Sequence, residues 1–102
     1  MAYSYTARFA KCNARINQLT TRINQINNQT LVLQNILSNE IPKRNFLVSQ
    51  LQYNSDRSPL RKEYVRVNRK IQDLQNKIHS NNMKVIELNS KIAMERNKCF
   101  GG

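Results

Sequence analysis

Catalytic chemistry has few candidate residues in this 102-residue chain, which holds one histidine, two cysteines and six acidic residues. No aspartate, serine or cysteine stands at helical spacing from His79 to form a nucleophile and base pair with it. Glu63, Asp73 and Glu87 fall on separate turns of one expected helix, so they form neither a paired-carboxylate site nor a metal cage. We therefore expect a protein that is not an enzyme and has no catalytic residues, no metal and no cofactor.

The two cysteines, Cys12 and Cys99, lie near opposite ends of the chain. With a single histidine they do not supply the four ligands of a zinc site. They could form a disulfide, but without an export signal we favour reduced thiols packed in the core. Cys99 is also fourth from the end, as prenylation requires, although Phe100-Gly101 is a poor match to the two aliphatic residues of that motif.

The charge balance sets 17 Lys and Arg against 6 Asp and Glu, a formal net charge of +11. Two Gly and two Pro are too few for the turns of a sandwich, a barrel or a phosphate-binding loop. No apolar run approaches the ~20 residues that cross a bilayer, and the N-terminus lacks the apolar stretch of a signal peptide. We expect a soluble, intracellular protein, cytoplasmic by default.

Apolar residues recur at alternating steps of three and four in two long runs, a pattern typical of helices packed along a heptad seam. The first run covers residues 9–37 and the second covers residues 60–99. Each continues through polar residues without losing its spacing, at Thr30 in the first run and at Asn81 and Glu95 in the second. The residues expected to carry most of the seam are Leu19, Ile23, Ile26, Leu33, Leu37, Leu74, Ile78, Val85, Leu88 and Ile92.

Turn-forming residues cluster at 54–58, between the two runs, where Ser58 can cap a helix that begins at Pro59. Pro42 is the competing break, because a proline inside a helix costs ~3 kcal/mol. We place the turn at 54–58 and expect a kink or short interruption near Pro42. The reason is the register that each choice produces.

A chain that folds back about Asp56 brings positions equally distant from Asp56 face to face. Cys12 then meets Cys99 and the polar Thr30 meets the polar Asn81, whereas a reversal at Pro42 pairs neither couple. The same register continues past Pro42 into layers at residues 40–51. The sequence thus predicts an all-α fold, a long antiparallel two-helix hairpin that resembles a coiled coil. The expected organisation is one domain, 1–102, with a first arm at 1–53, the turn at 54–58 and a second arm at 59–100.

Lysines and arginines occupy the position before many seam residues, at steps of seven. In an antiparallel pair both rows lie on the same border, with Arg15 near Lys98 and Arg22 near Lys91, and such like-charge flanking is destabilising. A linear positive field suits an acidic helix, an acidic protein surface or a phosphate backbone. We name this row the basic edge and expect it to bind a partner; it comprises Arg8, Arg15, Arg22, Lys70, Lys77, Lys84, Lys91 and Lys98.

Further apolar residues fall outside the seam, several of them at multiples of seven in the second arm. A two-helix seam buries too little apolar surface to offset the ordering of a chain this long, so we expect other helices or further copies of the chain to cover these residues. We name them the outer apolar line; it comprises Leu31, Val32, Ile36, Val65, Ile86 and Phe100.

These features together predict a non-enzymatic structural or adaptor subunit of a larger multi-protein assembly, without a small-molecule substrate. One alternative is a nucleic-acid-binding protein that uses the basic edge without sequence preference, although no aromatic residues interleave with that row for base stacking. A second alternative is a parallel homodimeric coiled coil, in which each seam residue faces its own copy.

Overall fold

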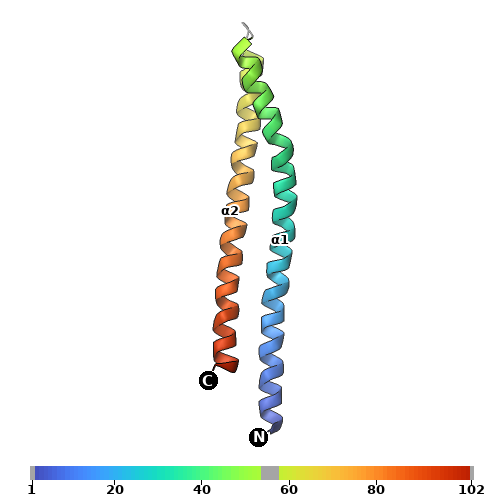
Figure 1. Ribbon diagram of the computed structural model, residues 1–102, viewed down its shortest axis with the longest axis vertical. Coiled ribbons are helices and arrows are strands. Elements are labelled where there is room, and N and C mark those ends of the chain that lie inside the picture. Colours follow the sequence, from blue (N-terminus) through green and yellow to red (C-terminus); the bar gives the residue numbers. More distant parts are fainter. Residues whose placement is uncertain (1, 54–57, 102) are drawn as a thin grey trace. The chain divides into compact units, whose positions relative to one another are not determined.

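The computed structural model describes residues 2–53 and 58–101, with side chains described from residue 7 onward. Two α-helices make up this part of the chain: α1 spans Ala2–Tyr53 and α2 spans Ser58–Phe100. They pack against each other in antiparallel directions (Figure 1), which confirms the predicted all-α hairpin. Of the predicted turn at 54–58, residues 54–57 lie outside the described residues, and Ser58 is already the first residue of α2.

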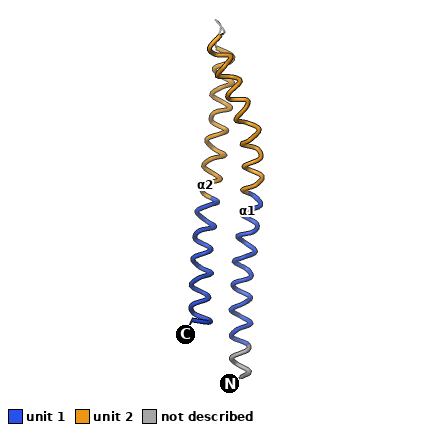
Figure 2. The backbone as a smooth tube through the Cα atoms, viewed as in Figure 1, with its two compact units in different colours: residues 1–29, 81–102 blue, residues 30–80 orange. Residues whose placement is uncertain are grey.

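The contacts divide the chain into two compact units, coloured separately in Figure 2. Unit 1 comprises residues 1–29 and 81–102, and unit 2 comprises residues 30–80. Each unit therefore combines a segment of α1 with a segment of α2. The expected single hairpin domain, 1–102, stays a prediction.

The seam follows the heptad pattern in both units. Every position assigned to the two runs, and every layer position between residues 40 and 51, is buried or half-buried among the described residues. In unit 1 the most buried seam side chains are Cys12, Ile26 and Ile92. Helical periodicity explains the result, because residues three and four apart share one face of a helix.

Unit 2 contains an apolar cluster. Leu47, Val67 and Ile71 are buried together, and Ile71 is only 1% exposed. Leu37, Ile41, Leu60 and Tyr64 pack around them. These residues come from both helices, so the register predicted from Asp56 extends past Pro42. Burying a side chain the size of Ile71 contributes ~1.5 to 3 kcal/mol.

Pro42 lies inside α1, which runs through it without a break. The expected short interruption is therefore absent, and the ribbon instead bends towards α2 in the stretch around this proline (Figure 1). A proline removes one N–H donor from the helix and crowds the preceding turn, and such helices bend rather than end when packing holds both sides. Leu47 and Ile41 supply that packing beyond and before the proline.

Two hydrogen bonds at the C-terminal end of α2, one local and one from α1, engage two of its last carbonyl oxygens. The Gly101 N–H donates to the Asn97 carbonyl oxygen at 3.1 Å. A Cβ atom at Gly101 would approach that same oxygen to 2.9 Å, so glycine fits where a side chain would crowd the bond. Arg8 of α1 donates through Nη2 to the Lys98 carbonyl oxygen at 3.3 Å. A cation near the negative end of a helix dipole is favourable.

Candidate functional site

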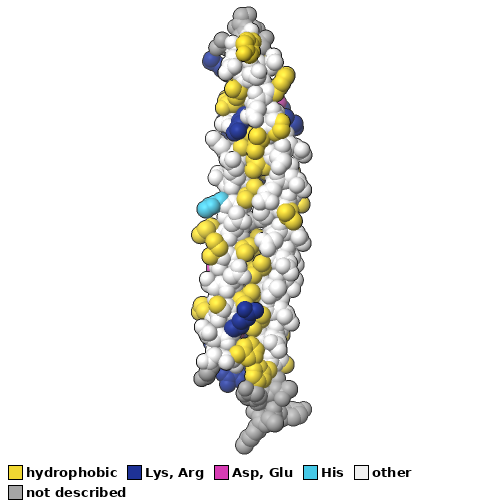
Figure 3. Space-filling view, viewed as in Figure 1, with side chains coloured by type: hydrophobic (Ala, Val, Ile, Leu, Met, Phe, Trp, Pro, Cys, Tyr) yellow, Lys and Arg dark blue, Asp and Glu magenta, His cyan; other side chains and the backbone are white. Residues whose placement is uncertain are grey.

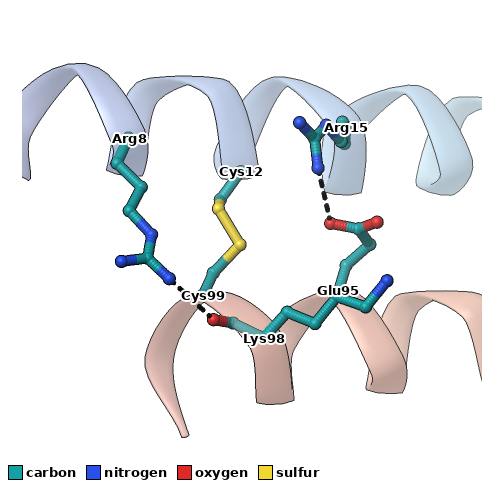
Figure 4. Close-up of a disulfide and its surroundings, with 6 residues drawn as sticks. All are labelled: Arg8, Cys12, Arg15, Glu95, Lys98 and Cys99. Atoms are coloured by element: carbon teal, nitrogen blue, oxygen red, sulfur yellow. Dashed lines mark hydrogen bonds and ion pairs between the residues drawn. A yellow bond between two sulfur atoms is a disulfide. The ribbon is translucent and has the colours of Figure 1, made fainter. Parts of the chain in front are cut away.

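Cys12 of α1 and Cys99 of α2 form a disulfide in unit 1 (Figure 4), and their Cα atoms lie 6.2 Å apart. The preference for reduced thiols is thus wrong for this structure, whereas the predicted register that placed the two cysteines in one layer is confirmed. The physical reason is distance: a Cα separation in this range permits a disulfide, and the antiparallel register sets it. Both cysteines occupy seam positions, and Cys12 is buried.

Disulfides persist mainly in oxidising compartments. We expected the cytoplasm together with reduced thiols, and the cytoplasmic location stays a prediction. Among the helices of the described residues, none is long and apolar enough to span a membrane.

Three further contacts join α1 and α2 around the disulfide. Arg15 Nη1 donates to Glu95 Oε2 at 3.3 Å, one layer away from the cysteines (Figure 4). The rings of Phe9 and Phe100 stack with centroids 5.0 Å apart and planes 14° apart. The bond from Arg8 to the end of α2 is the third. Phe100, which we had assigned to the outer apolar line, is thus engaged with α1.

A pocket of about 410 Å³ opens beside the disulfide, between the first turns of α1 and the last turns of α2. Four of its lining side chains are cationic and none is acidic. The lining residues are Ala7, Arg8, Lys11, Cys12, Arg15, Lys98 and Cys99. Lys11 is not part of the predicted basic edge, and sequence reasoning missed it. Its spacing of three from Arg8 and four from Arg15 is the signal that could have found it.

The basic edge is partly neutralised within unit 1. Arg15 pairs with Glu95, and Lys91 pairs with Glu87 of the next turn at 3.6 Å. The side chains of Arg22, Lys84 and Lys98 are exposed and have no ion pair among the described residues. Positive charge that is not balanced inside the chain therefore remains along this part of α1 and α2.

Unit 2 holds two residues of the basic edge, Lys70 and Lys77. Lys70 Nζ lies 3.0 Å from Glu40 Oε1, and Lys43 Nζ lies 3.2 Å from the same oxygen. Glu40 is 5% exposed, and the hydrogen bonds from Lys70 and then Lys43 lower the pKa of its carboxyl group below the ordinary value. Lys70 is thus a structural contact of the hairpin, whereas exposed Lys77 has no ion pair among the described residues.

Glu63 and Arg66 form a second ion pair in unit 2, within one turn of α2. The pairing raises the pKa of the Arg66 guanidinium above its ordinary value. Neither residue was a candidate in the sequence. Their spacing of three is a common one for helical ion pairs, so this contact is local and does not join the helices.

Most side chains of the outer apolar line are exposed, but one is half-buried. Leu31, Val32, Val65 and Ile86 are each about half exposed or more. Ile36 is half-buried, because its place on the helix brings it beside the seam. Phe100 is also exposed, at 47%, and the other exposed large apolar side chains among the described residues are Phe46, Val48, Tyr53, Met83 and Met94.

The described residues contain no cluster of three or more His, Cys, Asp or Glu side chains that could hold a metal ion. His79 is exposed, and its side chain stands out from the surface in Figure 3. No buried polar side-chain atom in the described part of the chain lacks a hydrogen-bond partner. The features that the structure brings together in unit 1 are therefore a disulfide, a pocket lined by cationic residues and a row of exposed cations.

Comparisons with protein-family models, with curated proteins and with solved structures found no match to this chain.

Proposed function

We propose that the chain is a non-enzymatic structural or adaptor subunit of a larger multi-protein assembly, and that its basic edge binds an acidic helix or acidic surface of a partner protein. The observation that carries the proposal is the set of cations in unit 1 that have no acidic partner within the described chain. Arg22 and Lys84 represent this set, because both are exposed and neither lines the pocket at the disulfide.

The charge balance supports a partner of opposite sign. The chain carries 17 cations and six acidic residues, and in the described part Glu40, Glu63, Glu87 and Glu95 are all engaged by cations of the chain itself. Few carboxylates are left to neutralise the basic edge from within. A negative partner relieves this repulsion and is steered towards the edge by its field.

The exposed apolar side chains support contact with partner helices beside the charged contact. Met83 and Ile86 of unit 1 lie on adjacent turns of α2 and are each more than half exposed. Large apolar side chains that recur on one helical face are typical of an interaction surface.

We propose an intracellular location for the assembly, in a compartment that keeps the Cys12–Cys99 disulfide oxidised.

The test is binding of a helical Glu-rich peptide, measured by fluorescence anisotropy near 50 mM salt. The double substitution Arg22→Gln and Lys84→Gln is compared with Arg61→Gln and Lys62→Gln, which removes the same charge at exposed positions of unit 2. We expect the first pair to weaken binding about tenfold and the control pair about twofold, because surface ion pairs contribute up to about 1 kcal/mol each. Equal losses would contradict a specific edge.

A duplex DNA titration in the same buffers tests the nucleic-acid alternative. If about five phosphates are neutralised, the logarithm of the affinity falls with the logarithm of the salt concentration at a slope of about −4.5. Tight duplex binding with that slope, together with no binding of the acidic peptide, would replace the proposal by the alternative. Duplex binding that is undetectable near 50 mM salt leaves the protein-partner version.

A further inference from the structure

We propose that the pocket beside the Cys12–Cys99 disulfide is a binding site for a small oligophosphate anion, held by Arg8, Lys11, Arg15 and Lys98. The pocket measures about 410 Å³. Small-molecule sites commonly range from about 300 to 1,000 Å³, so a compact anion with several charged groups fits this volume. An acidic helix, about 10 Å wide, would lie across the edge and not enter the pocket.

The charge of the lining selects an anion. Arg8, Lys11, Arg15 and Lys98 all line the pocket, and no carboxylate does. Arg8, Lys11 and Arg15 are spaced by three and four along α1, so their side chains share one face. Like charges at this spacing destabilise a helix, and an anion bound among them removes that repulsion. Glu95, the nearest acidic residue, is already paired with Arg15.

The surface of the pocket itself is mostly carbon, contributed largely by the stems of these side chains, so an anion would be bound by the donors at the ends of the stems. Arg8 donates through Nη2 to the Lys98 carbonyl oxygen, and Arg15 donates through Nη1 to Glu95. A guanidinium has five N–H groups, so both arginines keep donors beyond these bonds. The ammonium groups of Lys11 and Lys98 have no ion pair among the described residues. Phosphate suits this set because guanidinium groups bind its oxygens in pairs.

The contacts around the pocket hold its two walls in place before a ligand arrives. Cys12 and Cys99 are themselves lining residues, so a covalent bond joins the wall made by α1 to the wall made by α2 (Figure 4). The arginine contacts fix two of the cationic side chains on the same border. A site whose groups are already positioned loses less entropy on binding. The disulfide therefore acts as a positioning element of the site.

Calorimetric titration with inorganic tripolyphosphate near 50 mM salt tests the site on the oxidised full chain. The substitution Lys11→Gln removes a pocket cation outside the basic edge, and Lys62→Gln is the matched control that removes an exposed lysine of unit 2 outside both the pocket and the basic edge. We expect Lys11→Gln to weaken binding about fivefold and Lys62→Gln less than twofold, in line with one exposed charged contact. Equal affinities of the two variants, or no binding to the oxidised chain, would overturn the proposal.

Sulfate at matched ionic strength distinguishes an oligophosphate site from general anion attraction. We expect tripolyphosphate to remain bound in its presence, and full displacement would overturn the proposal. A double Cys12→Ser and Cys99→Ser variant tests the positioning role, with circular dichroism to check that the helices persist. We expect about fivefold weaker binding in a folded variant. Unchanged affinity would overturn that role, while Lys11→Gln still tests the site itself.

The phosphate site and the proposed adaptor function are tested by different substitutions, so one proposal can be contradicted without the other. The peptide experiment changes Arg22 and Lys84, neither of which lines the pocket, and the titration changes Lys11, which is outside the basic edge. Tripolyphosphate binding without peptide binding would support the site and contradict the adaptor proposal, and the reverse result would do the opposite.

Discussion

Lys70 Nζ of α2 lies 3.0 Å from Glu40 Oε1 of α1, and the register places Glu40 in the same seam layer as Ile71, the most buried side chain of unit 2. A charge in the seam would destabilise the hairpin if it were left unpaired. Lys70 and Lys43 both donate to the carboxylate, so the negative charge is retained among apolar neighbours. Lys70 of the basic edge, itself exposed, thereby neutralises a carboxylate that is buried in the seam.

Substituting Glu40→Gln tests this contact through its pH dependence. The hydrogen bonds from Lys70 and then Lys43 lower the folded-state pKa of Glu40 below its ordinary value of 4.5. The stabilisation is therefore fully present above about pH 4.5 and is lost as the pH falls through the lowered folded-state pKa. We expect the wild-type chain to melt above the variant at pH 7, with the gap closing in more acidic solution.

Thermal unfolding followed by circular dichroism measures that gap. Glu87→Gln is the control, because Glu87 pairs with Lys91 on an exposed face and contributes little to stability at any pH. A gap between wild type and Glu40→Gln that stays constant from neutral to acidic solution would contradict the role assigned to Glu40.

Substituting Ile71→Ala tests the core of unit 2. Ile71 is 1% exposed and packs with Leu47 and Val67, so its truncation leaves a cavity and should cost about 2 to 5 kcal/mol. Ile86→Ala, at a side chain that is 59% exposed, should change stability by less than about 0.5 kcal/mol. Urea unfolding measures both. Equal costs would mean that the outer apolar line is also covered in solution.

Substituting both Cys12 and Cys99 by serine tests the disulfide. Closing so long a loop stabilises a folded chain by about 4 kcal/mol in the chain-entropy account, so we expect the variant to unfold at lower urea concentration. The oxidised wild-type chain should run as a monomer on a non-reducing gel, lighter by two hydrogen atoms in intact-mass measurement. Dimers that dissociate on reduction would instead favour the parallel homodimer, in which Cys12 faces Cys12.

Substituting Pro42→Ala tests the bend in α1. Alanine restores the missing N–H donor and removes the clash with the preceding turn. We therefore expect the melting temperature to rise and the free energy of unfolding to increase by up to about 3 kcal/mol. Pro59→Ala is the matched control, because proline is favourable in the first turn of a helix and its loss should not stabilise the chain. A drop in stability for Pro42→Ala would show that the packing of Leu47 depends on the bend.

The sequence by itself determined the helices, their antiparallel pairing and the identity of the seam. Steps of three and four place residues such as Ile26, Val67 and Ile92 on one helical face, and this periodicity is a local property that needs no coordinates. The register also follows from the chain alone, because the distance of each position from the turn decides which residue faces it. The meeting of Cys12 with Cys99 is the clearest example.

Only the tertiary structure decided how individual side chains are used within that frame. The bond between Cys12 and Cys99, the convergence of Lys70 and Lys43 on Glu40, and the pocket that Lys11 completes all depend on distances across two helices. Heptad spacing assigns a residue to a face, but the reach and direction of a long cationic side chain vary with its rotamers and its neighbours. The path of α1 through Pro42 also depends on tertiary contacts. Packing on both sides of the proline, and not local helix propensity, decides whether the helix ends there.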